Sequence, residues 1–254
     1  MGQIICISSG KGGVGKTVAA INIGTALAEM GKKVTLLDGS LTTPDVSLYL
    51  NIPLTVRTLN DVLSGRCELD KAVFEHKSGL KIIPSSVRMD FKNVFSTKKA
   101  TEMLSALREA NDFLIIDSPA GLGPDTRDAM KVSDHIIVVT NPDVVALVDS
   151  FKAVKTALDY NKNVAGIIMN KTGSYKGELK DGDVKVMMEG VPIIGKIPYH
   201  RIVFEAVKKS MPVLHHEPRS HVAHEFRKIA HHIAGEKYEK RGLLARIFGW
   251  GRKK

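Results

Sequence analysis

GKGGVGKT, residues 10–17, has the spacing G-x-x-x-x-G-K-[ST] of a phosphate-binding loop. A β-rich apolar run at 3–8 precedes it and a helical pattern at 16–30 follows it. A strand on one side and a helix on the other form the context that such a loop requires. The sequence therefore predicts a strand, a glycine-rich turn and a helix in this order at the N-terminus.

Short runs rich in Ile, Val and Leu recur along the chain at residues 3–8, 33–38, 80–84, 112–117, 135–140, 164–170 and 192–198. They are continuous rather than alternating, which is typical of strands buried on both faces. Helical patterns lie between them, at 16–30, 101–110, 143–159 and 201–209, and residues 40–79 favour short helices. This alternation predicts an α/β fold with a mostly parallel, twisted sheet flanked by helices, and ligands at the carboxyl ends of the strands.

Charge is distributed unevenly along the chain, whose formal net charge is +10 over 254 residues. Residues 237–254 hold seven lysines and arginines and a single acid, so the rest is nearly balanced. We expect a P-loop ATPase domain over 1–235 and a basic segment over 236–254. The two cysteines, Cys6 and Cys67, form no C-x-x-C pair, which argues against a disulfide framework or a cysteine metal site. Without an apolar run long enough to span a membrane, the protein is expected to be cytoplasmic.

Each residue type in the loop suits a part of a nucleotide's phosphate chain. Gly12, Gly13 and Gly15 allow backbone N–H groups to turn inward and cradle phosphate oxygens. Lys16 is expected to reach the β- and γ-phosphates, and the Thr17 hydroxyl to bind Mg²⁺. A second acidic element is Asp117, which ends the run at 112–117 and is expected to hold a Mg²⁺-bound water. Gly121, in the loop that follows Asp117, is a candidate sensor of the γ-phosphate. The expected cofactors are ATP or ADP and Mg²⁺.

With its extra lysine, KGGVGKT at 11–17, together with DSPAG at 117–121, resembles the deviant Walker A family of MinD and ParA ATPases, including archaeal MinD-like members. The resemblance covers residues 1 to about 233 and extends to the tail. It implies a P-loop NTPase fold of the SIMIBI type and hydrolysis of ATP to ADP and phosphate. It also implies a homodimer that encloses two ATP molecules, in which Lys11 of each copy reaches the other copy's phosphates. Such a cation neutralises charge that develops in phosphoryl transfer.

Three further positions follow from the resemblance. Asn170 matches an asparagine whose amide reads the adenine edge, and Pro198 falls where family members line the base pocket. Asp149 matches an acidic residue near the dimer face, although a surface aspartate on a helix is the simpler account. The expected nucleotide-binding residues are Gly10, Lys11, Gly12, Gly13, Val14, Gly15, Lys16, Thr17, Val18, Asn170 and Pro198.

LLDGSLTTPD, residues 36–45, departs from the family at a catalytic position. The family reads D-x-D here, and its second aspartate orients the attacking water; this chain keeps Asp38 but has Ser40 in the second place. A hydroxyl holds a water but does not accept its proton effectively at neutral pH. Asp38 points the same way along a strand as residue 40 and is a candidate to compensate. We therefore expect slow hydrolysis with Lys11, Lys16, Asp38 and Ser40 as the catalytic residues, or else a pseudoenzyme.

The C-terminal segment has the pattern of a short interfacial helix. Its apolar residues gather on one helical face, and lysines and arginines surround them. This predicts peripheral binding to the anionic inner face of the cell membrane. A helix docked on the protein's own body and a nucleic-acid-binding arm are the alternatives. The residues expected to enter the membrane are Leu243, Leu244, Ile247, Phe248 and Trp250.

Together these features predict a MinD-like, ATP-dependent dimerising switch that binds a membrane and positions cell-division or surface-structure machinery. An unidentified protein partner or activator is expected. A ParA-like DNA-partitioning ATPase is the first alternative, and it predicts salt-sensitive binding to nonspecific DNA. A metabolic P-loop ATPase or iron–sulfur carrier is the second, which the missing C-x-x-C disfavours.

Overall fold

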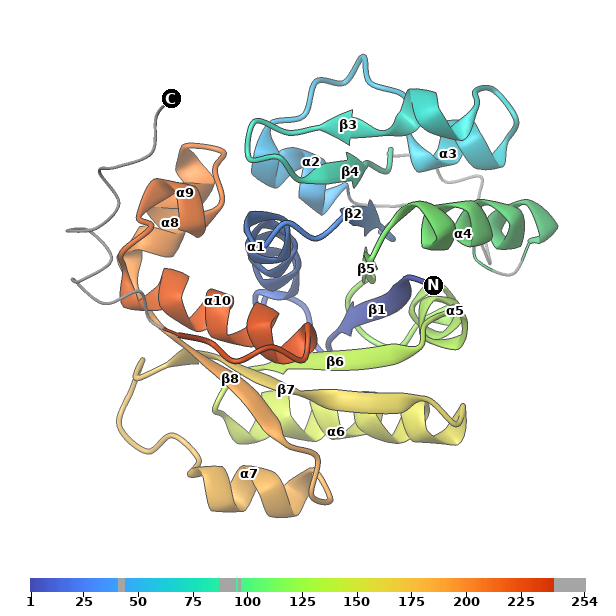
Figure 1. The fold of residues 1–254 in the computed structure, drawn as a ribbon. Coiled ribbons are helices and arrows are strands. Elements are labelled where there is room, and N and C mark those ends of the chain that lie inside the picture. Colours follow the sequence, from blue (N-terminus) through green and yellow to red (C-terminus); the bar gives the residue numbers. More distant parts are fainter. Residues whose placement is uncertain (41–43, 87–94, 96, 240–254) are drawn as a thin grey trace.

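Eight strands form a single sheet in the computed structural model, which describes residues 1–40, 44–86, 95 and 97–239. Their order across the sheet is β3-β4-β2-β5-β1-β6-β7-β8 (Figure 1). Every neighbouring pair is parallel except β3 and β4, which run antiparallel. The strands are β1 (Gln3–Ser8), β2 (Val34–Asp38), β3 (Phe74–Glu75), β4 (Lys81–Ile83), β5 (Phe113–Asp117), β6 (His135–Thr140), β7 (Asn163–Thr172) and β8 (Ile193–Pro198). The predicted mostly parallel sheet is confirmed.

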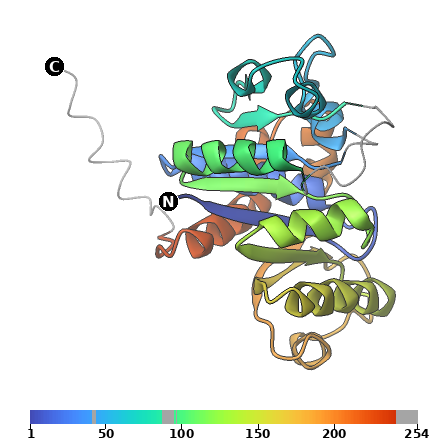
Figure 2. The same ribbon diagram turned by 90° about the vertical axis from the view of Figure 1, so that its right-hand side faces the viewer.

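Helices cover both faces of this sheet, as Figures 1 and 2 show from two directions. One apolar cluster joins the sheet to α1 (Lys16–Glu29), α2 (Asp45–Leu50), α8 (Arg201–Lys208), α9 (Val213–His216) and α10 (His221–Ile233). A second cluster joins it to α3 (Leu59–Leu63), the 3-10 turn η1 (Leu69–Ala72), α4 (Lys98–Ala110), α5 (Pro124–Val132), α6 (Val144–Asp159) and α7 (Asp181–Met187). The result is a three-layer α/β/α arrangement.

The central strands are buried on both faces, which explains their continuous apolar sequence. Every residue of β2 and β5 is buried, and so is β1 from Ile4 onward. Helix α1 contacts the sheet on one side and α10 on the other, so it too is almost wholly buried after its first turn. The loop that joins β1 to α1 is thereby fixed at both ends by core elements.

All seven predicted strands and all four predicted helices are present, with boundaries that differ by at most three residues. Residues 40–79 hold α2, α3 and η1, as expected for short helices. The sequence patterns did not single out β3, α5, α7, α9 or α10. Strand β3 has two residues, too few to show a period, and α5 and α7 are one- to two-turn helices in polar sequence.

The predicted tail lies mostly beyond the described residues. Leu243, Leu244, Ile247, Phe248 and Trp250 all fall outside them. Helix α10 ends at Ile233, and the boundary at residue 235 stays a prediction. Across 1–40, 44–86, 95 and 97–239, no helix has both the length and the apolar composition to cross a membrane.

Candidate functional site

The loop between β1 and α1 has a backbone that glycine alone adopts easily. Gly13 and Gly15 have φ angles of 76° and 95°, in the left-handed region. A Cβ on Gly15 would also lie 2.1 Å from Nδ2 of Asn170, whereas a Cβ on Gly13 would meet nothing within 4 Å. Glycine is therefore required at residue 15 both by its positive φ and by the lack of space for a side chain.

Asp117 joins the loop to the neighbouring strand β5. Nζ of Lys16 lies 2.7 Å from its Oδ1, and the Thr17 hydroxyl donates to its Oδ2, also over 2.7 Å. Lys16 is 7% exposed and Asp117 is fully buried, so this is a buried ion pair in which each charge has a partner. The hydroxyl of Thr17 and the carboxylate of Asp117 are hard oxygen donors, the kind that Mg²⁺ prefers. The predicted metal residues are thus brought together and fit this cation.

Two consecutive side chains at the end of β7 hold the loop from the other side. Nδ2 of Asn170 donates to the Val14 carbonyl over 2.7 Å, and Nζ of Lys171 donates to the Gly13 carbonyl over 2.8 Å. Lys171 itself has a φ of 58°, unusual for a residue with a side chain. Sequence reasoning missed Lys171, whose only signal was its place next to Asn170.

Lys11 differs from Lys16 in every structural respect. Its side chain is exposed and hydrogen-bonds no described residue, although its carbonyl accepts a bond from the Ser9 hydroxyl over 3.0 Å. Next to it, Gly10 rests against α6, since a Cβ there would lie 2.0 Å from the carbonyl oxygen of Asp149. The carboxylate of Asp149 pairs with Lys152 at 3.0 Å. Lys11 is therefore presented outward beside the start of α6.

The loop after β5 closes onto the phosphate-binding loop through the backbone. The N–H of Gly121 donates to the carbonyl of Ser9 over 3.2 Å, and Gly121 has a φ of 78°. Gly12 faces the same segment, since a Cβ there would touch Cβ of Ala120 at 3.7 Å. Gly121, expected to sense the γ-phosphate, therefore lies beside the loop.

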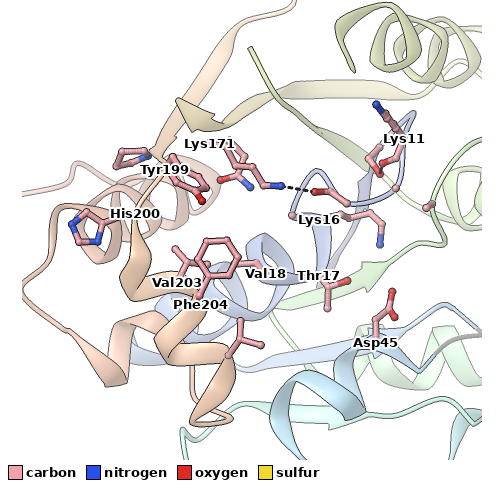
Figure 3. Close-up of a pocket in the computed structure, with 18 residues that line it drawn as sticks. Lys11, Lys16, Thr17, Val18, Asp45, Lys171, Tyr199, His200, Val203 and Phe204 are labelled. Carbon is pink, nitrogen blue, oxygen red and sulfur yellow. Dashed lines mark hydrogen bonds between the residues drawn. The ribbon is translucent and has the colours of Figure 1, made fainter. Parts of the chain in front are cut away.

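A cavity of about 280 Å³ opens along this loop and continues to α8 (Figure 3). It is lined by Lys11, Lys16, Thr17 and Asn170 together with Gly12, Gly13 and Gly15. The predicted residues Gly10 and Val14 do not line it, since Gly10 lies against α6 and Val14 is buried in the core. The far end is apolar and is lined by Val18, Pro198, Tyr199, Val203, Phe204 and Val207. Figure 3 shows Tyr199, Val203 and Phe204 on the α8 side, away from Thr17.

The apolar end of the cavity consists largely of exposed side chains. Phe204 is 57% exposed and Tyr199 is 52% exposed, and their rings meet edge to face with centroids 5.9 Å apart. Pro198, which was expected in the base pocket, lines the same end, whereas Tyr199, Val203, Phe204 and Val207 were not expected. Their signal was Val203, Phe204 and Val207 at one-turn spacing on α8, which sequence alone assigns equally well to a core face.

Asp38 and Ser40 lie beneath the cavity and do not line it. The N–H of Ser40 donates to Oδ1 of Asp38 over 3.0 Å, and the Ser85 hydroxyl donates to the carbonyl of Ser40 over 2.7 Å. Oδ2 of Asp38 is buried and accepts no hydrogen bond from the described residues. Burial, and then the negative charge of Asp117, raise the pKa of Asp38 to about 8. The catalytic roles of both residues stay predictions.

Comparison with known proteins shows similarity over nearly the whole chain. The ParA family model, described as NUBPL iron-transfer P-loop NTPase, matches residues 1–234. An uncharacterized ATP-binding protein of Methanocaldococcus jannaschii is 34% identical over 239 residues, which are 94% of this chain and 90% of that protein. The cell division ATPase MinD of Pyrococcus furiosus superposes with a TM-score of 0.85 at 31% identity, over 92% of this chain and 99% of that one. The septum site-determining protein MinD of Pyrococcus horikoshii, complexed with Mg-ADP, gives a TM-score of 0.84 at 32% identity, over 97% and 98%.

Proposed function

Because the chain belongs to the ParA family of P-loop NTPases, we propose that it is a MinD-like ATPase switch. It binds Mg-ATP in the cavity along residues 10–17, pairs with a second copy, and positions machinery for cell division or for surface structures. The observation that carries the proposal is the contrast between two lysines of one loop. Lys16 is buried on Asp117, whereas Lys11 is exposed beside α6.

The side chains around the loop are suited to bind the phosphates and the cation of a nucleotide. A triphosphate would offer Lys16 a more strongly charged partner than Asp117, and the carboxylate of Asp117 would then be available to help hold Mg²⁺. Mg²⁺, when bound, neutralises phosphate charge, with Thr17 and Asp117 as its protein residues. Lys171 and Asn170 hold the carbonyls of Gly13 and Val14, which keeps the loop's N–H groups free for phosphate.

The apolar end of the cavity fits a nucleobase. Tyr199 and Phe204 are exposed rings next to Val203 and Val207, so a base placed there removes apolar surface from water. Asn170 lies between this end and the loop, which suits the proposed contact of its amide with the adenine edge. ATP therefore spans the cavity from Lys16 to Phe204.

The proposed hydrolysis is slow. Ser40 replaces the aspartate of the family, and Asp38, the nearest acid in the chain, is buried away from the cavity. With its pKa near 8, Asp38 is protonated at neutral pH and is a poor base. The ATP-bound state is accordingly long-lived.

A face for a second copy adjoins the loop. Val144, Val145 and Val148 occupy the first turns of α6 and are 57%, 61% and 42% exposed. They flank Asp149, whose backbone supports Gly10, so the apolar face and Lys11 lie together. A second copy docked here would cover the valines and receive Lys11 at its own phosphates. The proposed membrane contact of the tail rests on its sequence pattern alone.

Analytical ultracentrifugation with a non-hydrolysable ATP analogue tests the switch. The wild type is expected to form dimers with the analogue and to remain monomeric with ADP. Lys11→Ala is expected to bind nucleotide normally and to dimerise at least tenfold more weakly, while Lys77→Ala, an exposed lysine in a distant turn, behaves as the wild type. Dimerisation that is independent of nucleotide, or equal in Lys11→Ala, contradicts the proposal.

Vesicle sedimentation tests the membrane part separately. The full chain is expected to sediment with vesicles rich in anionic lipid only when the ATP analogue is present, and a chain that ends at Gly235 is expected to stay in the supernatant. Equal sedimentation of the two chains contradicts the proposed role of the tail. Binding to duplex DNA that falls steeply with salt would favour the ParA-like alternative instead.

The iron-transfer description of the family model raises the second alternative, a cluster carrier. Cys6 does not suit it, because it is fully buried in β1 and burial raises the pKa of its thiol to about 12. Cys67 is half-buried and follows α3 in the chain, and it would be the only cysteine ligand per chain. An anaerobic absorbance spectrum of the reconstituted protein is expected to show no cluster band.

A further inference from the structure

Asp45 is the only carboxylate among the described residues that line the nucleotide cavity. It begins α2, and Figure 3 shows it on the side of the cavity where Thr17 lies, far from Tyr199. The other charged lining residues are Lys11, Lys16 and Lys171, as expected for a polyphosphate site. A carboxylate in such a place repels the phosphates unless a cation stands between them. Its position therefore calls for a cation.

The carboxylate of Asp45 has no partner among the side chains and backbone groups of the described residues. This carboxylate takes part in no hydrogen bond or ion pair with a described residue, although Asp45 begins a helix. By contrast, both oxygens of Asp117 are engaged, one by Lys16 and one by Thr17. Asp38 is buried below the cavity. Asp45 is thus the acid at this end whose oxygens are available to a ligand.

Asp45 lines the same cavity as Lys16 and Thr17, and its charge interacts with those of Lys16 and Asp117. Burial, and then the negative charge of Asp117, raise the pKa of Asp45, while the charge of Lys16 lowers it. The two carboxylates therefore repel each other across the phosphate end of the cavity. A divalent cation with its water shell relieves that repulsion, and Mg²⁺ keeps several waters when it binds.

We propose that Asp45 is a third protein residue, besides Thr17 and Asp117, that would hold the nucleotide's Mg²⁺, through water molecules that the cation keeps. This inference rests on the proposed binding of Mg-ATP in this cavity. Without the cation Asp45 repels the triphosphate, and with it Asp45 attracts the complex, so this residue makes nucleotide affinity depend on Mg²⁺.

Isothermal titration with a non-hydrolysable ATP analogue tests this, once in excess Mg²⁺ and once in EDTA. The quantity to compare is the dissociation constant in EDTA divided by the dissociation constant in Mg²⁺. In Asp45→Asn the ratio is expected to fall about tenfold from the wild-type value, because binding weakens with Mg²⁺ and strengthens without it. Asp45→Ser is expected to do the same, and Asp45→Glu to restore part of the ratio. Thermal unfolding confirms that each variant is folded.

Asp70→Asn is the matched control. Asp70 is an exposed acid in the first turn of η1 and lies outside the cavity, so its ratio is expected to equal that of the wild type. A ratio in Asp45→Asn and Asp45→Ser within twofold of the wild type overturns the role of Asp45. If the wild type itself binds no nucleotide under either condition, the proposed function fails instead, so the two failures are distinguishable.

Discussion

The two ends of the cavity are built in opposite ways. At the phosphate end, Lys16 and Asp117 are buried and already hydrogen-bonded, and the loop around them is fixed by side chains from β7. At the base end, Tyr199 and Phe204 are more than half exposed. A buried charge must have a partner before the ligand arrives, because desolvation without one is costly, whereas an apolar ring can stay in water at modest cost. The phosphate end is therefore preorganised, and the base end is completed by the ligand.

The largest expected effect tests how rigid the phosphate end is. Gly15→Ala and Gly13→Ala both place a side chain at positive φ, which costs about 1–2 kcal/mol. Only at Gly15 does the new Cβ also meet Asn170, at 2.1 Å. Gly15→Ala is expected to weaken binding of Mg-ATP about a hundredfold and Gly13→Ala about tenfold. Titration calorimetry measures both, with thermal unfolding as the control. Equal losses would mean that conformation alone matters here and that the Asn170 contact is dispensable.

A second prediction concerns the acids beneath the phosphate end. The pKa of Asp38 is raised to about 8, above its unfolded value of roughly 4, so the native state keeps a proton that the unfolded state releases. The free energy of unfolding should therefore fall by up to about 1.4 kcal/mol per pH unit as pH rises from 4 to 8 on account of this group. Asp38→Asn is expected to remove that slope.

Urea denaturation at pH 5, 6 and 7 compares the two proteins. The variant is expected to gain stability over the wild type as pH rises, because it has no proton to lose. Parallel profiles would show that Asp38 ionises normally in the folded protein and that the phosphate end tolerates a second charge beside Asp117.

The smallest effect is expected at the base end. Phe204→Ala should weaken ATP binding about fivefold, since one aromatic contact contributes about 1 kcal/mol. Binding of tripolyphosphate, which has no base, should not change. Val186→Ala, an exposed apolar residue of α7, serves as the control. A loss of tripolyphosphate affinity in Phe204→Ala would show that the two ends are not separable.

The two ends also differ in how far sequence predicts them. The phosphate end is local: residues 10–17 and the strands around them specify the loop through periodicity and spacing, and Asp117 follows from the end of a buried run. The base end depends on the position of α8, which is set by the pairing of β8 with β7. The sequence of α8 alone does not show this position. Lys171 at the end of β7 and Asp45 at the start of α2 were missed for the same reason, because a single lysine or aspartate gives no sign of the cavity that it lines.

The ion pair between Lys16 and Asp117 has a consequence for affinity. In this structure the carboxylate of Asp117 pairs with the ammonium group of Lys16 that the phosphates of ATP would need, so Asp117 competes with ATP for Lys16. Because β1 pairs with β5, Asp117 stays beside Lys16 at every protein concentration. Because the pair must open before ATP binds Lys16, the observed dissociation constant is the intrinsic one divided by the fraction of molecules in which Lys16 is free, so it rises tenfold for every about 1.4 kcal/mol of pair stability. A stronger pair between Lys16 and Asp117 would therefore stabilise the protein without ATP and weaken its binding of ATP.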